Sequence, residues 1–334
     1  MALVEVQTVA TPAVPRIKPI IRDVLVESRP NIPIKFNAIS HLAYVNRPTV
    51  LTMKDLGLPE DLGISPVAVS QPFPLFTEEA IRIMRTEVFT KEVWDNCLQS
   101  TAFAKCQIRG HCPKYAPFMY NAWTDPKTLS IISDIAGIDL IPMIDIDIGN
   151  LNISVEDEGH DKDRVVNQSD DDVPITNWHY DSYPFVCVVM MSDASKMVGG
   201  ETALRNGSGE IIKVRGPQMG SAVILQGRCI SHQALAALGG GERITMITSF
   251  RPRDPMVRDT SVLTSIRPIS NPSDLYFQWA QYRLEVLRAR LAVMLQELEE
   301  QHRAQRPTDV SRIKQFLQLQ EEWIAATNKE IVVV

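Results

Sequence analysis

Three side chains of the kinds that bind a transition metal occur in order along this chain. His179 and Asp181 stand two positions apart at the head of an apolar segment, and His232 follows later. Side chains at positions i and i+2 of a strand point to the same side, so His179 and Asp181 can reach one ion together. Two imidazoles and one carboxylate occupy one face of an octahedral ferrous ion and leave the opposite face open. The ordered set therefore predicts a mononuclear non-haem iron(II) site.

A cation follows these residues in the segment Arg243-Ile-Thr245. A 2-oxo acid that chelates iron through its 1-carboxylate and keto oxygen would bury its far carboxylate, and an arginine can pair with that group through two parallel hydrogen bonds. Thr245 shares the strand face of Arg243 and can add a hydroxyl group. Arg251 lies on the same face and remains a second candidate. Arg243 is preferred because it is nearer His232 in the chain.

The residues that must position this site predict a β-rich core over residues 138–255. The segment Ile141–Val155 alternates apolar and polar residues, as a half-buried strand does. Short apolar segments separated by Gly and Asn turns follow, and they are typical of a sandwich or jelly roll and not of alternating βα units. These strands are predicted at Tyr183–Met191, Glu201–Arg205, Gly209–Val214, Ala222–Gln226, His232–Leu238 and Arg243–Phe250.

Two segments outside these strands predict irregular chain. Residues 1–75 are rich in proline and β-branched residues, which predicts an extended N-terminal arm with one short strand around Ile34–Phe36. The segment from Glu156 to Asp172 is strongly acidic. A run of charge usually faces solvent, so this segment predicts a mobile loop near the entrance of the site.

Residues 76–137 predict helical support for the core. Thr77 can cap a first helix, because its side chain can accept a hydrogen bond from the first turn. A second helix is predicted to open at Thr124 or Asp125 and to end at Gly137, where glycine adopts the left-handed conformation that terminates helices.

Residues 256–334 predict a C-terminal helical hairpin. Apolar side chains recur at helical spacing in two stretches separated by Arg306-Pro307. Such stripes bury each other or the outside of the β core, while a dimer seam or a lid over the substrate remain as alternatives. The first stripe is Leu284, Leu287, Leu291, Met294 and Leu298, and the second is Ile313, Phe316, Leu317, Trp323 and Ile324.

Several motifs together resemble one known superfamily, the Fe(II)/2-oxoglutarate-dependent oxygenases. They are WHYDS at 178–182, GGET at 199–202, SAVILQG at 221–227, His232 and RIT at 243–245. GGET is most similar to the prolyl-hydroxylase-like branch. The wider pattern, from NWHYDSYPFVCVVMMSD to MITSFRPRDP, resembles a group of fungal small-molecule oxygenases.

The resemblance implies a mainly β fold with flanking helices, built on a double-stranded β-helix (jelly-roll, cupin-like) core. It matches His179, Asp181 and His232 to the iron-binding triad, and Arg243 and Thr245 to the residues that bind 2-oxoglutarate. The implied cofactor is Fe(II), with 2-oxoglutarate and O₂ as cosubstrates. The implied reaction hydroxylates, desaturates or oxidatively cyclises a small organic substrate and releases succinate and CO₂.

Other functions remain as alternatives at this point. GGET leaves open a peptidyl-prolyl-type hydroxylase, and the C-terminal helices leave open a non-catalytic jelly-roll module for binding or assembly. For the substrate pocket, Tyr183, Arg205 and Tyr120 are weak candidates. Tyr183 is included because it shares the strand parity of the two metal ligands on its segment.

Bulk composition limits the partners of the chain. Its 334 residues carry a net charge of −6 without a basic stripe, which argues against nucleic acid. No apolar run reaches the length of a transmembrane helix, and the first residues lack the pattern of a signal peptide. We therefore expect a cytoplasmic protein with a small-molecule substrate and no membrane partner. A homodimer through the C-terminal helices stays open.

Overall fold

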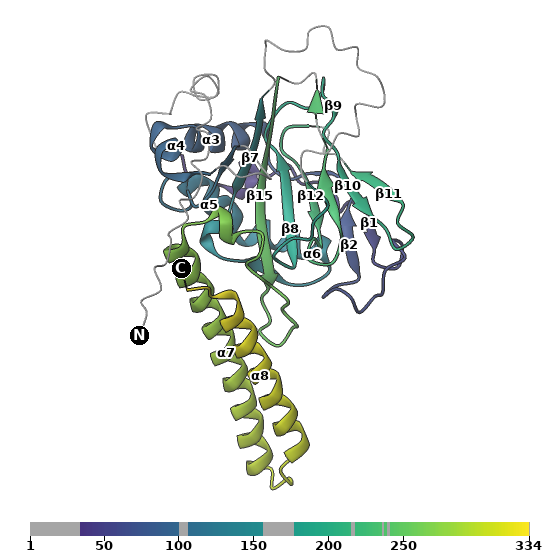
Figure 1. The fold of residues 1–334 in the computed structure, drawn as a ribbon, viewed down its shortest axis with the longest axis vertical. Helices are drawn as coiled ribbons and strands as arrows, with labels where there is room; N and C mark the ends of the chain where they lie inside the picture. The colour runs from purple at the N-terminus through teal and green to yellow at the C-terminus, as the bar shows by residue number, and fades with distance from the viewer. Residues whose placement is uncertain are drawn as a thin grey trace, which may run out of the picture.

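The computed structural model describes residues 34–99, 106–155, 177–214, 218–235, 237–238 and 241–333. Its largest sheet is antiparallel and is built around the long strand β15 (Glu242–Pro252) (Figure 1). On one side β15 pairs with β8 (Phe185–Met190), and β8 pairs with β12 (Ser221–Leu225). On its other side β15 pairs with β6 (Leu140–Pro142) and β7 (Asn150–Val155).

Shorter strands extend this sheet at both edges. Beyond β7 lie β5 (Gln107–Ile108) and β4 (Leu98–Gln99). Beyond β12 lie β2 (Val67–Ser70), its partner β1 (Val50–Thr52), and β3 (Phe73–Pro74). The strands β1 to β3 therefore belong to the β core, although the sequence predicts an irregular arm there.

A smaller sheet faces the large one. It consists of β11 (Ile211–Val214), β10 (Thr202–Arg205) and β13 (His232–Ala234). Beside it β9 (Val198–Gly199) pairs with β14 (Ala237–Leu238). Side chains of both sheets meet in one apolar cluster that includes Val69, Leu204, Val214 and Leu225. The chain is thus an antiparallel, β-rich fold with flanking helices, which is compatible with the predicted jelly-roll core.

The large sheet is covered on both faces, which explains its apolar strands. In β8, Phe185, Cys187 and Val189 pack into the cluster under the helices. Val186 and Val188, which alternate with them, face the smaller sheet. Side chains of a strand point alternately to its two faces, so a strand buried on both faces is apolar throughout.

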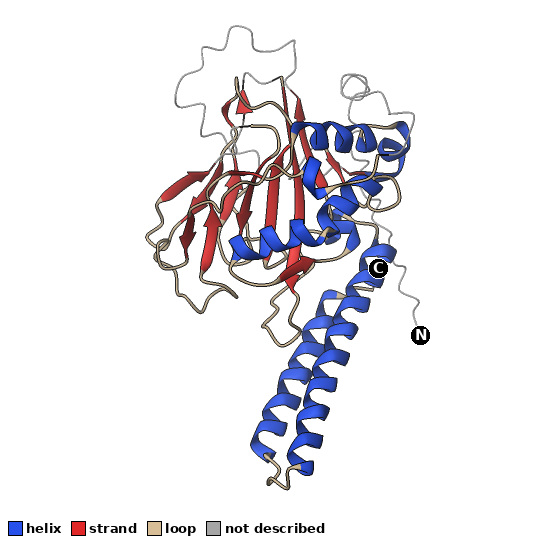
Figure 2. Ribbon diagram, turned by 180° about the vertical axis from the view of Figure 1, so that it is seen from behind, coloured by secondary structure: helices blue, strands red, loops and turns tan. Residues whose placement is uncertain are grey.

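Four helices form the layer on one face of the large sheet (Figure 2). They are α3 (Glu78–Val88), α4 (Lys91–Cys97), α5 (Pro117–Thr124) and α6 (Pro126–Ala136). The caps of α3 and α6 are as predicted: Thr77 accepts from the backbone N–H of Ala80 at 3.2 Å, and Asp125 opens α6, which ends at Gly137 with φ of 71°.

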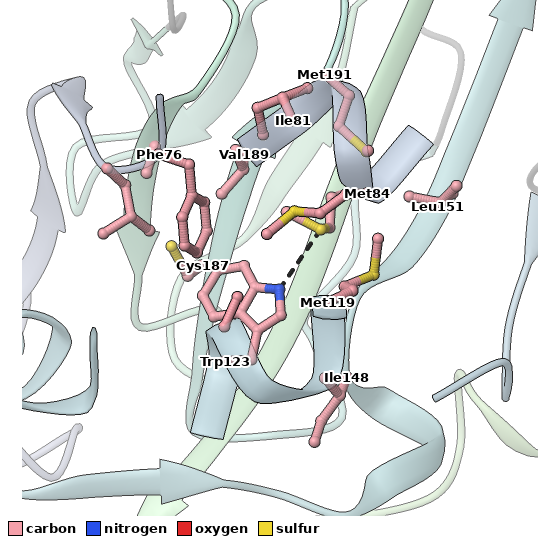
Figure 3. Close-up of a cluster of buried hydrophobic side chains, with 14 of the residues drawn as sticks. Phe76, Ile81, Met84, Met119, Trp123, Ile148, Leu151, Cys187, Val189 and Met191 are labelled. Carbon is pink, nitrogen blue, oxygen red and sulfur yellow. Dashed lines mark hydrogen bonds between the residues drawn. The ribbon is translucent and has the colours of Figure 1, made fainter. Parts of the chain in front are cut away.

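The helix α5 is the part of this layer that the sequence analysis does not predict. It brings Trp123 into the centre of the cluster, where the indole Nε1 donates to Met246 Sδ at 3.4 Å (Figure 3). The side chain of Trp123 is fully buried. Burial of a side chain of this size contributes on the order of 3 kcal/mol, so α5 anchors the helical layer on β15.

Two further expectations concern the N-terminal half. The strand around Ile34–Phe36 is wrong, because these residues have no regular structure and lead into the short helix α2 (Ala38–His41). The acidic segment from Glu156 to Asp172 lies outside the described residues.

The chain ends in two long helices, α7 (Pro272–Arg303) and α8 (Val310–Glu330), which lie side by side and project away from the sheets (Figure 1). The predicted leucine stripe of α7 is only partly buried: Met294 is buried, but Leu284 is 61% exposed and Leu291 is 45% exposed. The helix buries Leu275, Trp279, Tyr282, Arg283, Val286, Arg290 and Met294. Among the described residues, no helix is both long and apolar enough to cross a membrane.

Candidate metal centre

Backbone pairing brings the three predicted metal ligands together. His179 and His232 form a reciprocal pair: the N–H of His179 donates to the carbonyl of His232 at 3.0 Å, and the reverse bond is 2.9 Å. Two positions on, the N–H of Asp181 donates to the carbonyl of Gly227 at 3.0 Å. The segment that carries His179 and Asp181 therefore runs antiparallel to the chain that leads into β13.

The side chains converge from this backbone. One potential ligand atom from each of His179, Asp181 and His232 lies within 4.8 Å of the others. Asp181 Oδ1 is 3.5 Å from His232 Nε2 and 3.9 Å from His179 Nε2. Three donors at such separations can surround one ion after small rotations of the side chains, since iron–ligand distances are near 2 Å.

Hydrogen bonds select the ring nitrogen that each histidine presents. Nδ1 of His179 lies 2.8 Å from the carbonyl of Asn177, and Nδ1 of His232 lies 2.9 Å from the carbonyl of Ile230. A carbonyl oxygen only accepts, so each Nδ1 carries the proton and donates. Each Nε2 is left with its lone pair facing Asp181, which is the tautomer that binds a metal.

The same arrangement changes the pKa values of the site. Burial, reinforced by the adjacent His232, lowers the pKa of His179. Burial opposes a charge on His232, but the Asp181 carboxylate outweighs it and raises the pKa of His232. Burial likewise works against ionisation of Asp181, and the neighbouring His232 and His179 outweigh it and lower its pKa. Asp181 is thus held as the carboxylate that a metal requires.

A glycine makes room for this carboxylate. A Cβ on Gly227 would stand 1.8 Å from Asp181 Oδ2, far inside any allowed contact. In the same place, Asp181 Oδ2 is a buried oxygen without a hydrogen-bond partner among the described residues. Gly227 therefore gives Oδ2 the space it needs, and this placement leaves Oδ1 directed at the two histidines.

A cavity of about 140 Å³ opens beside the three side chains, between the two sheets. Its wall is mainly apolar, with Val186, Val188, Leu204, Val223 and Ile247 among its residues. One water needs about 10–15 Å³ of such space, so the volume suits an ion together with a small organic acid.

Arg243 and Thr245 both line this cavity, as predicted. Arg243 is only 8% exposed, and burial, partly offset by Glu201, lowers the pKa of its guanidinium. Its Nη2 donates to the carbonyl of Gly200 at 3.1 Å, whereas its Nε has no partner within the described part of the chain. A buried cation with an unused donor is costly, and an anion in the cavity would satisfy it.

The structure distinguishes Arg243 from Arg251, the second arginine that the sequence offers as a partner for the 2-oxo acid. Arg251 lies eight residues further along β15, about 26 Å away along an extended strand. There its Nε donates to the carbonyl of Met143 at 3.3 Å, and its guanidinium lies 5.1 Å from the ring centroid of Tyr282. Arg251 therefore contacts the C-terminal helices and not the cavity.

The three weak pocket candidates lie outside the cavity lining. Tyr183 points the other way, and its hydroxyl donates to Asp147 Oδ2 at 2.7 Å. The strand parity fails because residues 182–184 bend before β8 begins. Arg205 is exposed and stacks 4.4 Å from the ring centroid of Trp178. Tyr120 sits on α5, behind the large sheet, and borders the cluster under the helices.

Sequence reasoning overlooked three residues of the site: Asn152, Gly200 and Gly227. Asn152 lines the cavity from β7, opposite Thr245. A Cβ on Gly200 would press on Arg243 Nε at 3.3 Å, so GGET keeps space for the arginine. A signal was present for the glycines, since both lie within motifs quoted for the family resemblance, whereas Asn152 is an ordinary polar position of the predicted alternating segment.

These residues fit iron and a 2-oxo acid. Two neutral imidazoles and a carboxylate suit Fe(II), and the open side of the set faces the cavity. Asp181 Oδ1 lies near Nε2 of both histidines, as a shared ion would require, and Arg243 Nε can donate to an anion.

The chain is similar to solved structures of 2-oxoglutarate- and Fe(II)-dependent oxygenases. One is an oxidoreductase of the 2OG-Fe(II) oxygenase family from Burkholderia pseudomallei, with 15% identity over 46% of this chain and 64% of that chain, at a TM-score of 0.32. Another is a Pseudomonas putida prolyl-4-hydroxylase, with 13% identity over 53% of this chain and 88% of that chain, at a TM-score of 0.32.

A third is the non-haem alpha-ketoglutarate-dependent carbocyclase SnoK from nogalamycin biosynthesis, with 11% identity over 62% of this chain and 88% of that chain, at a TM-score of 0.36. No protein-family model and no curated protein matches the chain. The solved structures thus come from the superfamily that the motifs resemble, while the fungal branch has no counterpart among them.

Proposed function

We propose that this chain is an Fe(II)- and 2-oxoglutarate-dependent oxygenase that oxidises a small organic substrate. The substrate would be an amino acid or a secondary-metabolite intermediate, and the outcome hydroxylation, desaturation or oxidative cyclisation, with release of succinate and CO₂. The observation that supports this is one cavity shared by the His179–Asp181–His232 set and the buried guanidinium of Arg243. Iron, when bound, would supply the oxidising chemistry by activating O₂ against the 2-oxo acid.

The residues of the chain have distinct roles in this proposal. His179, Asp181 and His232 hold the ion from one side. Arg243 orients the 2-oxo acid through its distal carboxylate, and Thr245 adds a hydroxyl from the same strand face. The apolar wall keeps bulk water away from the reacting groups.

GGET gives no specific support to a prolyl peptide, because its contact with Arg243 would serve a peptide hydroxylase and a small-molecule oxygenase equally. The motif prompted the peptide alternative, but the carbonyl of Gly200 accepts a hydrogen bond from Arg243, and its missing side chain gives that arginine room. The motif is therefore explained by the cosubstrate site. A cytoplasmic location remains a prediction from the sequence.

Anaerobic titration with ferrous ion and then 2-oxoglutarate tests the proposal directly. We expect the weak visible absorption band of the iron–2-oxo acid chelate in the wild-type protein. His232→Leu should abolish the band, and His111→Leu, at a buried histidine outside the cavity, should retain it. A wild-type protein without a band, or a His232→Leu variant with the wild-type band, would refute the iron site.

Arg243 and Arg251 lie on the same strand and provide a matched pair of substitutions. Arg243→Met should raise the 2-oxoglutarate concentration needed for the band by at least about 30-fold, the loss expected for a buried charged hydrogen bond of about 2 kcal/mol. Arg251→Met should leave that concentration unchanged. Equal effects of the two substitutions would argue against the assigned cosubstrate site.

A substrate screen with succinate release as the readout then separates the remaining functions. A product heavier by one oxygen atom indicates hydroxylation, and one lighter by two hydrogen atoms indicates desaturation or cyclisation. Stimulation by proline-containing peptides alone would favour the peptidyl hydroxylase. Absence of even uncoupled 2-oxoglutarate turnover in the iron-loaded protein would favour the non-catalytic module.

A further inference from the structure

The two C-terminal helices expose apolar side chains at a seven-residue spacing. On α7, Phe277 is 68% exposed, Leu284 61% and Leu291 45%. On α8, Val310 is 62% exposed, Leu317 50% and Ile324 52%. Residues seven apart lie on the same side of a helix, and sustained spacing of this kind is the pattern of helices that pack along their length. Each helix therefore carries one exposed apolar stripe.

The stripes are distinct from the contact between α7 and α8. That contact includes Arg283, whose Nε donates to Thr327 at 2.8 Å, and Arg290, whose guanidinium lies 4.0 Å from the ring centroid of Trp323. Leu284 and Leu291 each follow one of these arginines by one position. Successive residues of a helix are rotated by about 100°, so the stripe of α7 is turned about 100° from the contact line.

The stripe of α8 is also rotated by about 100° from the line of contact between α7 and α8, in the same sense as the stripe of α7. Leu317 directly follows the buried Phe316, and Ile324 directly follows the buried Trp323. The helices are antiparallel, since Arg312 near the start of α8 pairs with Glu297 near the end of α7. On antiparallel helices, equal rotations in the same sense point to the same side of the pair. Both stripes therefore form one apolar face.

This face points away from the rest of the chain. On α7, Tyr282 faces the segment that connects the helix to the sheets, where its hydroxyl donates to Asp259 at 3.2 Å. Leu284 follows Tyr282 by two positions, which turns it about 200° to the opposite side. The pair of helices also projects beyond the sheets (Figure 1), and the stripe residues are exposed on both helices.

We propose that this face packs against the same face of a second copy of the chain and forms a four-helix bundle. The 21 residues of α8 give the face a length of about 31 Å, and two adjacent helices give it a width of about 20 Å. Its footprint of about 600 Å² is comparable to the roughly 800 Å² per partner of a stable interface. Exposed apolar patches of several hundred Å² often mark interaction sites.

Charges at the edges of the face identify the second copy as the occupant and set its direction. Arg288 and Glu321 are exposed and follow the stripe residues Leu284 and Leu317 by four positions, so each lies at the outer edge of its helix. The pair Arg283–Thr327 shows that position 288 of α7 lies level with about position 322 of α8.

Two directions of packing are available to identical helix pairs. With the two-fold axis along the bundle, α7 lies over α8 of the second copy. Arg288 of each copy then lies near Glu321 of the other copy, which gives two such pairs. With the axis across the bundle, α7 lies over α7 near its midpoint, and Arg288 meets its own counterpart. Opposite charges favour the first direction and like charges disfavour the second. The inferred dimer therefore has both helix pairs running in the same direction, with a β core on each side.

Light scattering coupled to size-exclusion chromatography tests this interface on the full chain. The wild-type protein should be a dimer at micromolar concentration. Leu317→Glu should raise the dimer dissociation constant at least about 100-fold and yield monomers, because it buries a charge in the seam. Leu319→Glu is the matched control: Leu319 is 58% exposed on the same helix but lies off the stripe, and this variant should remain a dimer.

A charge exchange tests the direction and does not depend on the apolar substitution. Arg288→Glu should weaken the dimer, and adding Glu321→Arg in the same chain should restore it. Circular dichroism should show wild-type helix content in every variant. A monomeric wild-type protein would overturn the proposal, as would a Leu317→Glu protein that dimerises like the wild type. Failure of the double exchange to restore binding would overturn the assigned direction.

Discussion

Two carboxylates in this protein, Asp147 and Asp181, have opposite hydrogen-bonding states. Asp147 is 1% exposed and is saturated: it accepts from Arg109, from Asn150 Nδ2 at 3.0 Å and from the Tyr183 hydroxyl at 2.7 Å. Asp181 has an oxygen with no partner in the described chain, and its other oxygen faces two histidines.

The difference distinguishes a carboxylate that stabilises the fold from one that can bind a ligand. A buried charge is tolerated when it is fully paired, and removing its partners or the charge itself is then costly. A buried oxygen that remains unpaired is tolerated only where something else completes it.

Asp181→Ala should lower the affinity for Fe(II) by at least about a thousandfold, or about 4 kcal/mol, because it removes the one anionic ligand. Anaerobic titration with a competing chelator measures the affinity. The free energy of unfolding of the metal-free protein should change less than in Asp147→Ala. Retention of wild-type iron affinity would show that Asp181 is a structural carboxylate like Asp147.

Asp147→Ala should lower the free energy of unfolding by about 3 kcal/mol, because Arg109 would be left as a buried cation without its carboxylate. Urea denaturation of the metal-free protein measures this loss. Fe(II) affinity of the folded variant should stay within about threefold of the wild type. A stable variant that no longer binds iron would reverse the roles given to the two residues.

Gly227→Ala should weaken Fe(II) binding by about 10- to 100-fold, the range for residues that orient metal ligands. The new Cβ would occupy the position of Asp181 Oδ2 and displace that side chain. Gly209→Ala provides a control for glycine replacement, because a Cβ there meets nothing within 4 Å. It should cost some stability, since Gly209 has φ of 87°, but no iron affinity.

The smallest expected effect is on the pH dependence of stability, and it comes from a buried histidine outside the site. His111 is fully buried under the helices, and burial together with Arg109 lowers its pKa to about 4. The unfolded chain protonates this residue below about pH 6.5 and the folded chain does not, so stability falls as pH drops from 6.5 towards 4.

Between pH 7.5 and pH 5.5 the contribution of His111 to this loss should be about 1.4 kcal/mol. His111→Leu should remove that part of the pH dependence in urea denaturation measured at both pH values. If the pH dependence of stability were unchanged in the variant, His111 would take up a proton in the folded protein. The cluster under the helices would then be more accessible to water than its packing indicates.

Local patterns allowed much of the fold to be predicted. Thr77 and Asp125 cap helices because a side-chain oxygen near an open N–H needs no distant partner. Most strands were recognisable as short apolar segments separated by Gly and Asn turns. Predictions failed where chain geometry changed without a sequence signal, as at Tyr183, where the bend at residues 182–184 breaks the alternation. The predicted burial of the α7 stripe was wrong at Leu284 and Leu291, because periodicity shows that a face is apolar but not what covers it.

The amino-acid sequence alone was enough to identify the chemical types of the metal ligands, the shared side of His179 and Asp181, and the short apolar segments that form strands, because these depend on neighbours one to four residues apart. Only the tertiary structure decided that His232 pairs with His179, that Arg243 and not Arg251 faces the cavity, and that Gly227 leaves space for Asp181. These relations arise from pairing between distant strands, and the distance between residues far apart in the chain is set by how the sheets assemble.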